Sequence, residues 1–297
     1  MSQALVRELI DAGIHFGHRA SRWNPKMGAY IFGKRNSIHI IDIRQTVKGL
    51  LRAKKFLSTV VANGQDVLII GTKRQAKDSV EKHARRVGMP FVAERWLGGT
   101  LTNFKTIRSR LTRLEYLEEV VRSGKIEEFS KKEKARASRE REKIFRNLEG
   151  IRTLTRLPGA IVVVDIKREH IAIKEAQKLR IPTVCLVDTD SNPDGADIII
   201  PGNDDAMRGI ELVIAALADA VEEGKRGREA MAQKDGEQSA GGPGHGRRSR
   251  RASTSTLAAD ASEPMPGEFP DKDVEAAVGA TSEASELQQP QTSESVS

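Results

Sequence analysis

The sequence predicts an open, mostly parallel α/β sheet flanked by helices, and two observations support this fold class. First, four short apolar runs are mostly β-branched and are bounded by Gly, Pro or Asp: residues 67–71, 160–165, 182–188 and 197–202. Their apolar character is nearly continuous, as expected of strands that are covered on both faces. Second, helical patterns lie between the runs. Strand–helix–strand alternation indicates parallel strands joined by right-handed crossovers.

The remaining elements of the sheet unit follow from local signals. Weaker strands are expected at 37–42 and 90–94, and helices are expected at 45–62, 73–87, 168–180 and 204–223. Pro182 follows the third of these helices closely, and proline does not continue a helix. The fourth opens on the polar run Asn203-Asp204-Asp205, which favours a helix N-terminus.

Residues 105–156 interrupt the alternation with a pair of charged helices. No strand pattern occurs there, and apolar residues instead recur every three or four positions: Ile107, Leu111, Leu114, Leu117 and Val121, then Ile144, Leu148, Ile151 and Leu154. This spacing is typical of a coiled-coil seam. Ser123-Gly124 ends the first helix, so we expect an antiparallel helical hairpin, inserted into the sheet unit as a coiled-coil arm.

The composition changes near residue 225, and this change sets the predicted domain organisation. Residues 225–297 are rich in Gly, Arg, Ser, Thr, Glu and Pro, and such a segment cannot bury enough apolar surface to offset its chain entropy. We therefore expect a sheet unit made of 1–104 and 157–224, an inserted hairpin at 105–156, and a disordered low-complexity tail at 225–297.

The charge distribution favours a polyanionic partner. Residues 1–225 hold 41 Lys and Arg against 29 Asp and Glu, a net charge of +12, whereas residues 226–297 hold 8 against 12, a net of −4. A strongly basic body most often binds nucleic acid, although charge alone also fits a protein that merely has a basic surface.

The compartment follows from what the chain lacks. The only cysteine, Cys185, lies in an apolar run, which indicates a buried strand residue in a reducing environment. The N-terminus has no apolar stretch typical of a signal peptide, and no run approaches the roughly 20 apolar residues of a membrane span. We expect a cytoplasmic protein that is not membrane-bound.

Enzymatic chemistry is the alternative that the sequence leaves open. A Rossmann-like enzyme would bind a nucleotide or sugar phosphate at the strand C-termini, around Gly71, Asp165 and Asp188. However, the turn after the first strong strand has neither the glycine fingerprint of dinucleotide-binding proteins nor a Walker pattern. Asp165 and Glu169 form a possible carboxylate pair without a His or Ser partner. We therefore predict no catalytic residues and no cofactor.

Metal binding is also disfavoured by the sequence. His15 and His18 are three residues apart, with His39 further on, but Gly17 argues against a helix there and no acidic residue lies close in sequence. Asp188, Asp190 and Asp194 resemble a calcium loop, yet Pro193 stands where an EF-hand needs glycine. We therefore predict no metal site. We interpret the aspartates at 188, 190 and 194 as part of a turn that follows a strand.

Two basic and aromatic segments are the best candidates for RNA contact. Residues 19–39 interleave Lys and Arg with Trp23, Tyr30 and Phe32, and residues 95–110 repeat the pattern around Trp96 and Phe104. Cations contact phosphates, and flat rings either stack on bases or pack inward. With the cations after the first strong strand included, the predicted RNA-binding residues are Arg22, Lys26, Arg35, Lys73, Arg74, Arg95, Lys105 and Arg108.

Several long motifs occur in the same order as in a known family. The segments IHFGHRASRWNPKM, SIHIIDIRQT, VLIIGTKRQA, GMPFVAERWLGGTLTNFKTI and IPTVCLVDTDSNPDGADIIIPGNDDAMRGI make residues 3–224 similar to the bacterial ribosomal protein S-two family, the second protein of the small subunit. Ser37 and Ile166 depart from the family pattern, which has glycine and proline there. The tail extends past the family's usual end.

The resemblance implies a flavodoxin- or Rossmann-like sheet domain with a protruding helical hairpin. It also implies a non-enzymatic structural role in which the protein binds ribosomal RNA near the hinge between head and body of the small subunit. The implied partners are other small-subunit proteins, including the largest one, ribosomal protein one, which family members help to dock. In this setting the Gly98-Gly99 pair is expected to form a tight turn at the base of the arm, not a nucleotide cradle.

Overall fold

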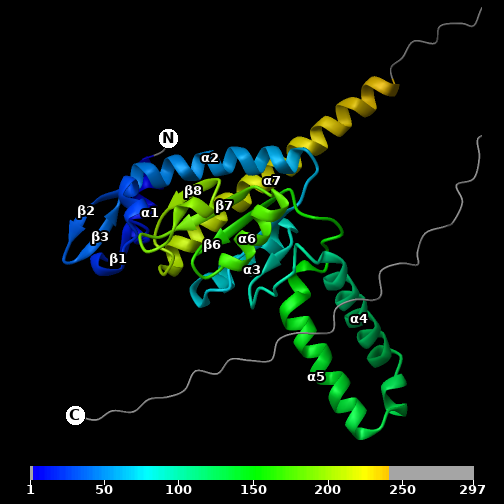
Figure 1. Cartoon of the computed structure of the whole chain (residues 1–297). Coiled ribbons are helices and arrows are strands. Elements are labelled where there is room, and N and C mark those ends of the chain that lie inside the picture. Colours follow the sequence, from blue (N-terminus) through cyan, green and yellow to red (C-terminus); the bar gives the residue numbers. More distant parts are fainter. Residues whose placement is uncertain (1–2, 241–297) are drawn as a thin grey trace, which may run out of the picture. The chain divides into compact units, whose positions relative to one another are not determined.

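The computed structural model describes residues 3–240, and its centre is a five-stranded parallel sheet (Figure 1). The strands are β4 (Val67–Ile70), β5 (Phe91–Val92), β6 (Ala160–Val164), β7 (Thr183–Val187) and β8 (Ile198–Pro201). Their spatial order is β5-β4-β6-β7-β8, with every neighbouring pair parallel. Counted along the chain this is 2-1-3-4-5, the flavodoxin-like order, so the predicted fold class is confirmed.

The sheet is buried on both faces because its strands are apolar at nearly every position. Val67 and Ile69 of β4 point into one core, whereas Leu68 and Ile70 point into the other, and β6 and β7 alternate in the same way. Successive strand residues face opposite sides of a sheet, so an unbroken apolar run supplies both cores at once. This is the physical reason that the continuous runs identify the sheet so well.

Three helices cover the first face and one covers part of the second. The first three are α2 (Ile43–Ala62), α3 (Arg74–Val87) and α7 (Met207–Ala240). α2 begins at Asp42, whose side chain accepts a hydrogen bond from the backbone N–H of Arg44, and α3 ends at Gly88 in the left-handed region. On the second face lies α6 (His170–Leu179), close to the base of the arm.

A second, three-stranded antiparallel sheet precedes the parallel one, and of its strands only the one at 37–42 was predicted. It follows α1 (Gln3–Asp11) and consists of β1 (Phe16–Arg19), β2 (Ile31–Arg35) and β3 (Ile38–Ile41), in the order β1-β3-β2. The short 3-10 helices η1 (Ala20–Arg22) and η2 (Pro25–Tyr30) join its first two strands. Asn36 and Ser37 turn the β2–β3 hairpin, and both have positive φ, so Ser37 holds a conformation that glycine adopts without strain.

The inserted hairpin is formed by α4 (Phe104–Arg122) and α5 (Lys131–Leu148), joined through η3 (Lys125–Glu128) (Figure 1). Its seam is apolar at most of the predicted positions, because Leu111, Leu114 and Leu117 are buried, but at its far end Val120 is buried in place of the predicted Val121. Ser130 and Glu133 form a reciprocal capping box that starts α5. At the base, Ile107 and Leu148 join the second core of the sheet, and this contact anchors the hairpin.

The ends of two helices differ from the sequence-based expectation. The second arm helix was expected to reach Leu154, but α5 ends at Leu148, and Ile151 lies in the short η4 (Glu149–Ile151). α7 runs on to Ala240, well past the expected end at residue 223, because residues 224–240 contain many good helix formers. The rest of the predicted tail, residues 241–297, lies outside the described residues. Between residues 3 and 240, no helix is long and apolar enough to cross a membrane.

Candidate nucleic-acid interface

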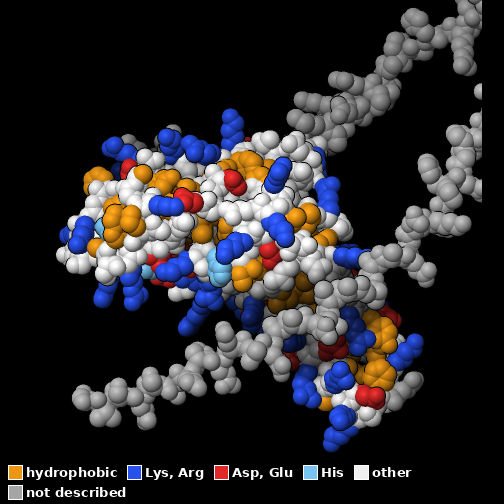
Figure 2. Space-filling view, in the orientation of Figure 1, with side chains coloured by type: hydrophobic (Ala, Val, Ile, Leu, Met, Phe, Trp, Pro, Cys, Tyr) orange, Lys and Arg blue, Asp and Glu red, His pale blue; other side chains and the backbone are white. Residues whose placement is uncertain are grey.

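The predicted RNA-binding residues are spread over four parts of the fold. They lie in η1 and η2 (Arg22, Lys26), at the end of β2 (Arg35), at the start of α3 (Lys73, Arg74), and along the base of the arm (Arg95, Lys105, Arg108). All except Lys73 are exposed. Figure 2 shows Lys and Arg side chains over both the sheet unit and the hairpin, with no single concentrated patch.

Six of the eight cations have no carboxylate partner among residues 3–240. Between residues 3 and 240, ion pairs within this set involve only Lys26, which pairs with Asp194, and Lys73. Arg108 donates a hydrogen bond to the carbonyl oxygen of Leu154 at 3.2 Å, which orients its guanidinium without neutralising it. The structure therefore leaves these positive charges available to an external anion.

Lys73 differs from the others because it is already surrounded by carboxylates. Its Nζ lies 2.7 Å from Asp204, 2.6 Å from Asp205 and 3.6 Å from Asp165. Burial opposes the charged form, but the hydrogen bonds to Asp204 and Asp205 outweigh it and raise the pKa of Lys73. The ammonium group neutralises an internal acidic cluster, so of the eight residues it is the least available to a phosphate.

The same strand ends bring a histidine to two buried carboxylates. His18 Nδ1 lies 3.0 Å from Asp188, which is fully buried, and pairing with Asp188 raises the pKa of His18 to about 9. Asp204 is 1% exposed, and burial together with the charge of Asp165 raises its pKa to about 7.

Among residues 3–240, these three residues form a group that could hold a metal ion. His18, Asp188 and Asp204 each offer one ligand atom, and these atoms lie within 4.8 Å of one another. Imidazole and carboxylate are ligands that Zn²⁺ accepts. No local pattern reveals this group, because Asp188 and Asp204 lie 170 and 186 residues from His18 in the chain and come close only through the ends of β7 and β8.

The two tryptophans have different environments. Trp96 is 7% exposed and packs in the second core, where its indole N–H donates to Glu175 at 3.1 Å. Trp23 is 39% exposed, and its ring lies 5.1 Å from that of His39 at an angle of 42°. Of the two, Trp23 is therefore the ring that a base could reach.

The backbone N–H groups of the Gly98-Gly99 loop bind the carboxylate of Glu175, an anion supplied by the protein itself. The Glu175 carboxylate of α6 accepts five hydrogen bonds from this loop: from the backbone N–H groups of Gly99, Leu101 and Thr102, the Thr102 hydroxyl and the Trp96 indole. Gly99 has a φ of 88°, which lets the backbone N–H groups converge. The expected tight turn at the arm base is present, and an internal carboxylate fixes it.

A second internal carboxylate fills the position at the start of α3 where a phosphate would bind. Glu169 is 3% exposed and accepts hydrogen bonds from the backbone N–H and the hydroxyl of Thr72, directly after Gly71. This point lies at the carboxyl ends of β4 and β6, where the strand order reverses and where ligands bind in open α/β sheets. Because a carboxylate occupies it, a phosphate there would meet like charge.

Phe32 is the most exposed aromatic ring between residues 3 and 240. Phe32 in β2 is 80% exposed and Phe16 in β1 is 46% exposed, on the two strands that flank β3. The cations around Phe32 place it among the rings that the sequence predicts either to stack on bases or to pack inward, and its exposure excludes inward packing. The signal that distinguishes it is its place beside Gly33 on a short antiparallel strand, where alternation points one face outward.

Comparisons with known proteins agree with the motif order. The sequence profile of ribosomal protein S2 matches residues 9–224. The small ribosomal subunit protein uS2 of Rhodopirellula baltica is 56% identical over 225 residues, which cover 76% of this chain and 86% of that protein. The uS2 protein of Syntrophobacter fumaroxidans is 49% identical over 235 residues, 79% of this chain and 86% of that protein. The chain therefore belongs to the ribosomal protein S2 family, whose members are structural, non-enzymatic proteins of the small ribosomal subunit.

Proposed function

We propose that this chain binds small-subunit ribosomal RNA, near the hinge between head and body, through exposed cations on the antiparallel sheet, the start of α3 and the base of the arm. The observation that carries the proposal is that Arg22, Arg35, Arg74, Arg95, Lys105 and Arg108 form no ion pair within residues 3–240. Unpaired surface cations release counterions when they meet phosphates. A chain that works on the ribosome in this way acts in the cytoplasm.

The proposed binding is distributed and non-catalytic. Each exposed cation contributes a modest amount, and the total depends on several contacts made at once. Glu169 fills the position after Gly71 at which a nucleotide-binding enzyme of this fold would hold a phosphate, and Glu175 occupies the backbone N–H groups of the Gly98-Gly99 loop. These contacts favour RNA binding over the alternative of a Rossmann-like enzyme.

Removing three of the unpaired cations should weaken RNA binding and lower its salt dependence. We expect the triple variant Arg22→Gln, Arg35→Gln, Arg95→Gln to reduce the slope of log affinity against log salt by about 2 to 3, because each lost phosphate contact removes about 0.7–0.9. The measurement is binding to purified small-subunit ribosomal RNA at several salt concentrations.

A matched control removes the same amount of charge from residues that are already paired. Lys82 pairs with Glu211, Arg86 with Asp219 and Arg226 with Glu222. The triple variant Lys82→Gln, Arg86→Gln, Arg226→Gln should leave the slope nearly unchanged. An equal fall in both triple variants would show that only net charge matters, and an unchanged slope in the first would contradict the proposed interface.

We also propose that the exposed rings of the antiparallel sheet help to dock ribosomal protein one. Phe32 and Phe16 expose apolar surface with which phosphates form no ion pair, and aromatic residues are enriched in the cores of protein–protein interfaces. Figure 2 shows apolar side chains among Lys and Arg at the end of the molecule that holds β2 and β3.

The double variant Phe16→Ala, Phe32→Ala should lose ribosomal protein one from otherwise intact small subunits. We expect its occupancy on gradient-purified subunits to fall about tenfold or more, as for the loss of anchors worth 2 kcal/mol or more. Tyr116→Ala is the control, since Tyr116 is 52% exposed but lies on the arm. Normal occupancy in the double variant, or an equal loss in the control, would refute the assignment.

A further inference from the structure

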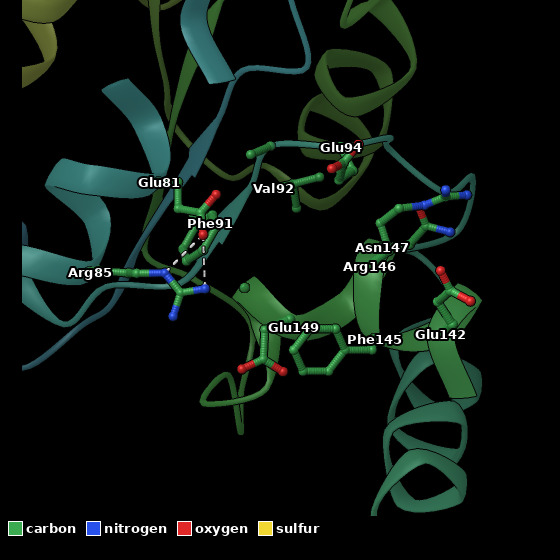
Figure 3. A pocket seen from close by; sticks show the side chains of 12 residues that line it. Glu81, Arg85, Phe91, Val92, Glu94, Glu142, Phe145, Arg146, Asn147 and Glu149 are labelled. Carbon is green, nitrogen blue, oxygen red and sulfur yellow. Dashed lines mark hydrogen bonds and ion pairs between the residues drawn. The ribbon is translucent and has the colours of Figure 1, made fainter. Parts of the chain in front are cut away.

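A pocket lies where the arm meets the sheet unit, and none of the eight predicted RNA-binding residues lines it. Its volume is about 320 Å³, the space of roughly ten water molecules, which is enough for one or two side chains. One wall comes from α3, β5 and the loop after β5, and the other from the last two turns of α5 and from η4 (Figure 3). An occupant would touch both the arm and the sheet unit.

Two aromatic rings give the pocket its apolar surface. Phe145 is 45% exposed, although its neighbours in the seam, Ile144 and Leu148, face the hairpin interior. Phe91 lies on the opposite wall, under the guanidinium of Arg85 at 5.3 Å from the ring centre. Arg85 is held by Glu81 at 2.9 Å, so its charge is neutralised and its position fixed. In Figure 3 the Phe145 ring lies between Glu149 and Glu142, beside the open space.

The charges around the rings are mainly negative, in contrast to the rest of the body. Four glutamates line the pocket, against two arginines: Glu81, Glu94, Glu142 and Glu149, with Arg85 and Arg146. Glu81 and Glu94 have cationic partners in Arg85 and Lys77. Glu149 has only a contact of 3.5 Å with Arg152, and Glu142 has no ion pair within residues 3–240. The pocket would repel RNA phosphates, whereas a cationic side chain would form ion pairs with Glu142 and Glu149.

The floor of the pocket is built by close backbone contact. Gly150 of η4 lies against the carbonyl oxygen of Phe91, so closely that a Cβ at this position would overlap it. This contact holds η4 beside the edge strand β5. The pocket is therefore preorganised by the backbone, and binding a segment there needs little rearrangement.

We propose that this pocket receives a Lys- or Arg-rich segment of another small-subunit protein. A basic side chain of that segment lies between Glu142 and Glu149, and an apolar side chain next to it packs between Phe145 and Phe91. The segment thereby fixes the arm against the sheet unit. This inference depends on the assignment to the small subunit and not on the proposed RNA contacts.

The test places a photo-reactive group in the pocket of assembled small subunits. p-Benzoylphenylalanine replaces Phe145 in one variant and Asn147, which also lines the pocket, in a second, so that a folding defect in either does not decide the outcome. Tyr116, exposed on α4, is the control position. After irradiation of purified subunits, peptide and RNA crosslinks are identified by mass spectrometry. We expect both pocket positions to crosslink to one Lys- or Arg-rich peptide of another small-subunit protein, and Tyr116 not to do so.

Charge reversal makes the test specific for the proposed chemistry. Adding Glu142→Lys should lower the crosslink yield about fivefold, because an attraction becomes a repulsion. Glu115→Lys, which reverses an exposed charge on the same hairpin outside the pocket, should leave the yield unchanged. Crosslinks to RNA, crosslinks only within this chain, no crosslink at either pocket position, or a yield insensitive to Glu142→Lys would each overturn the proposal, and none of them bears on the salt dependence of RNA binding.

Discussion

Replacing Glu175 by glutamine should destabilise the protein by about 3 kcal/mol. The glutamine keeps the shape of the side chain, but its NH2 group cannot accept, so at least two of the five donors around Glu175 lose their acceptor. A hydrogen bond to a charged group contributes about 1.5–3 kcal/mol, and an orphaned buried donor costs a similar amount. Urea unfolding followed by circular dichroism measures the change. Lys178→Gln, on the exposed face of the same helix, should stay within about 0.5 kcal/mol of the wild type.

The effect of Glu175 should depend on pH with a definite sign. Burial raises the pKa of Glu175, but hydrogen bonds from the backbone of Thr102 and Gly99 and from the Trp96 indole outweigh it, so the pKa lies below its ordinary value of 4.5. A lowered pKa contributes stability above pH 4.5 that is lost as pH falls through the folded-state value. The gap in unfolding free energy between wild type and Glu175→Gln should therefore narrow below about pH 4.5. A gap that is constant with pH, or widens in acid, would show that the charge of Glu175 is not what the loop binds.

Gly150→Ala should weaken the contact between η4 and β5 at the base of the arm and lower the free energy of unfolding by about 1–3 kcal/mol. The added methyl group would overlap the Phe91 carbonyl oxygen and press on the Phe91 ring, so η4 must move away from β5. Urea unfolding gives the loss of stability, and hydrogen exchange gives its location. Relative to the wild type, we expect the variant's amide exchange to speed up in η4 and at the start of α4 more than in β6 and β7.

Gly98 supplies the matched control at the same junction. A Cβ at Gly98 would meet no atom within 4 Å, and Gly98 is not among the residues with positive φ. Gly98→Ala should therefore be neutral or slightly stabilising, because alanine restricts the unfolded chain. Equal destabilisation by the two substitutions would mean that loss of glycine flexibility, and not the contact with Phe91, is responsible.

The sequence predicts the parallel sheet well for a local reason. A strand buried on both faces must be apolar at consecutive positions, so the runs around Val67, Ile161 and Val184 are recognisable without knowing their partners. The arm is equally local, since its seam repeats every three or four residues. The antiparallel sheet was missed except for β3, because its strands are four or five residues long and only partly buried, which leaves no clear alternation.

The sequence could indicate only those parts of the candidate site that depend on single residues and their neighbours in the chain. Exposed cations such as Arg22 and Arg95 follow from charge and aromatic neighbours. The pairing of Lys73 with Asp204, of His18 with Asp188 and of Glu175 with the Gly99 loop joins residues 76 to 170 positions apart. Such pairings depend on which strand ends meet, and no local pattern encodes that. The family resemblance supplied the function, and the structure supplied the reason that the glycine loop is not a ligand site.

The most direct test of the central claim is a residue-resolved map of RNA crosslinks, measured on purified small subunits that contain this chain. The account predicts crosslinks to ribosomal RNA at Arg22, Arg35, Arg74, Arg95, Lys105 and Arg108, and none at the ion-paired Lys82 and Arg86. A map in which the six unpaired cations face water, with no nucleic acid beside them, would contradict it.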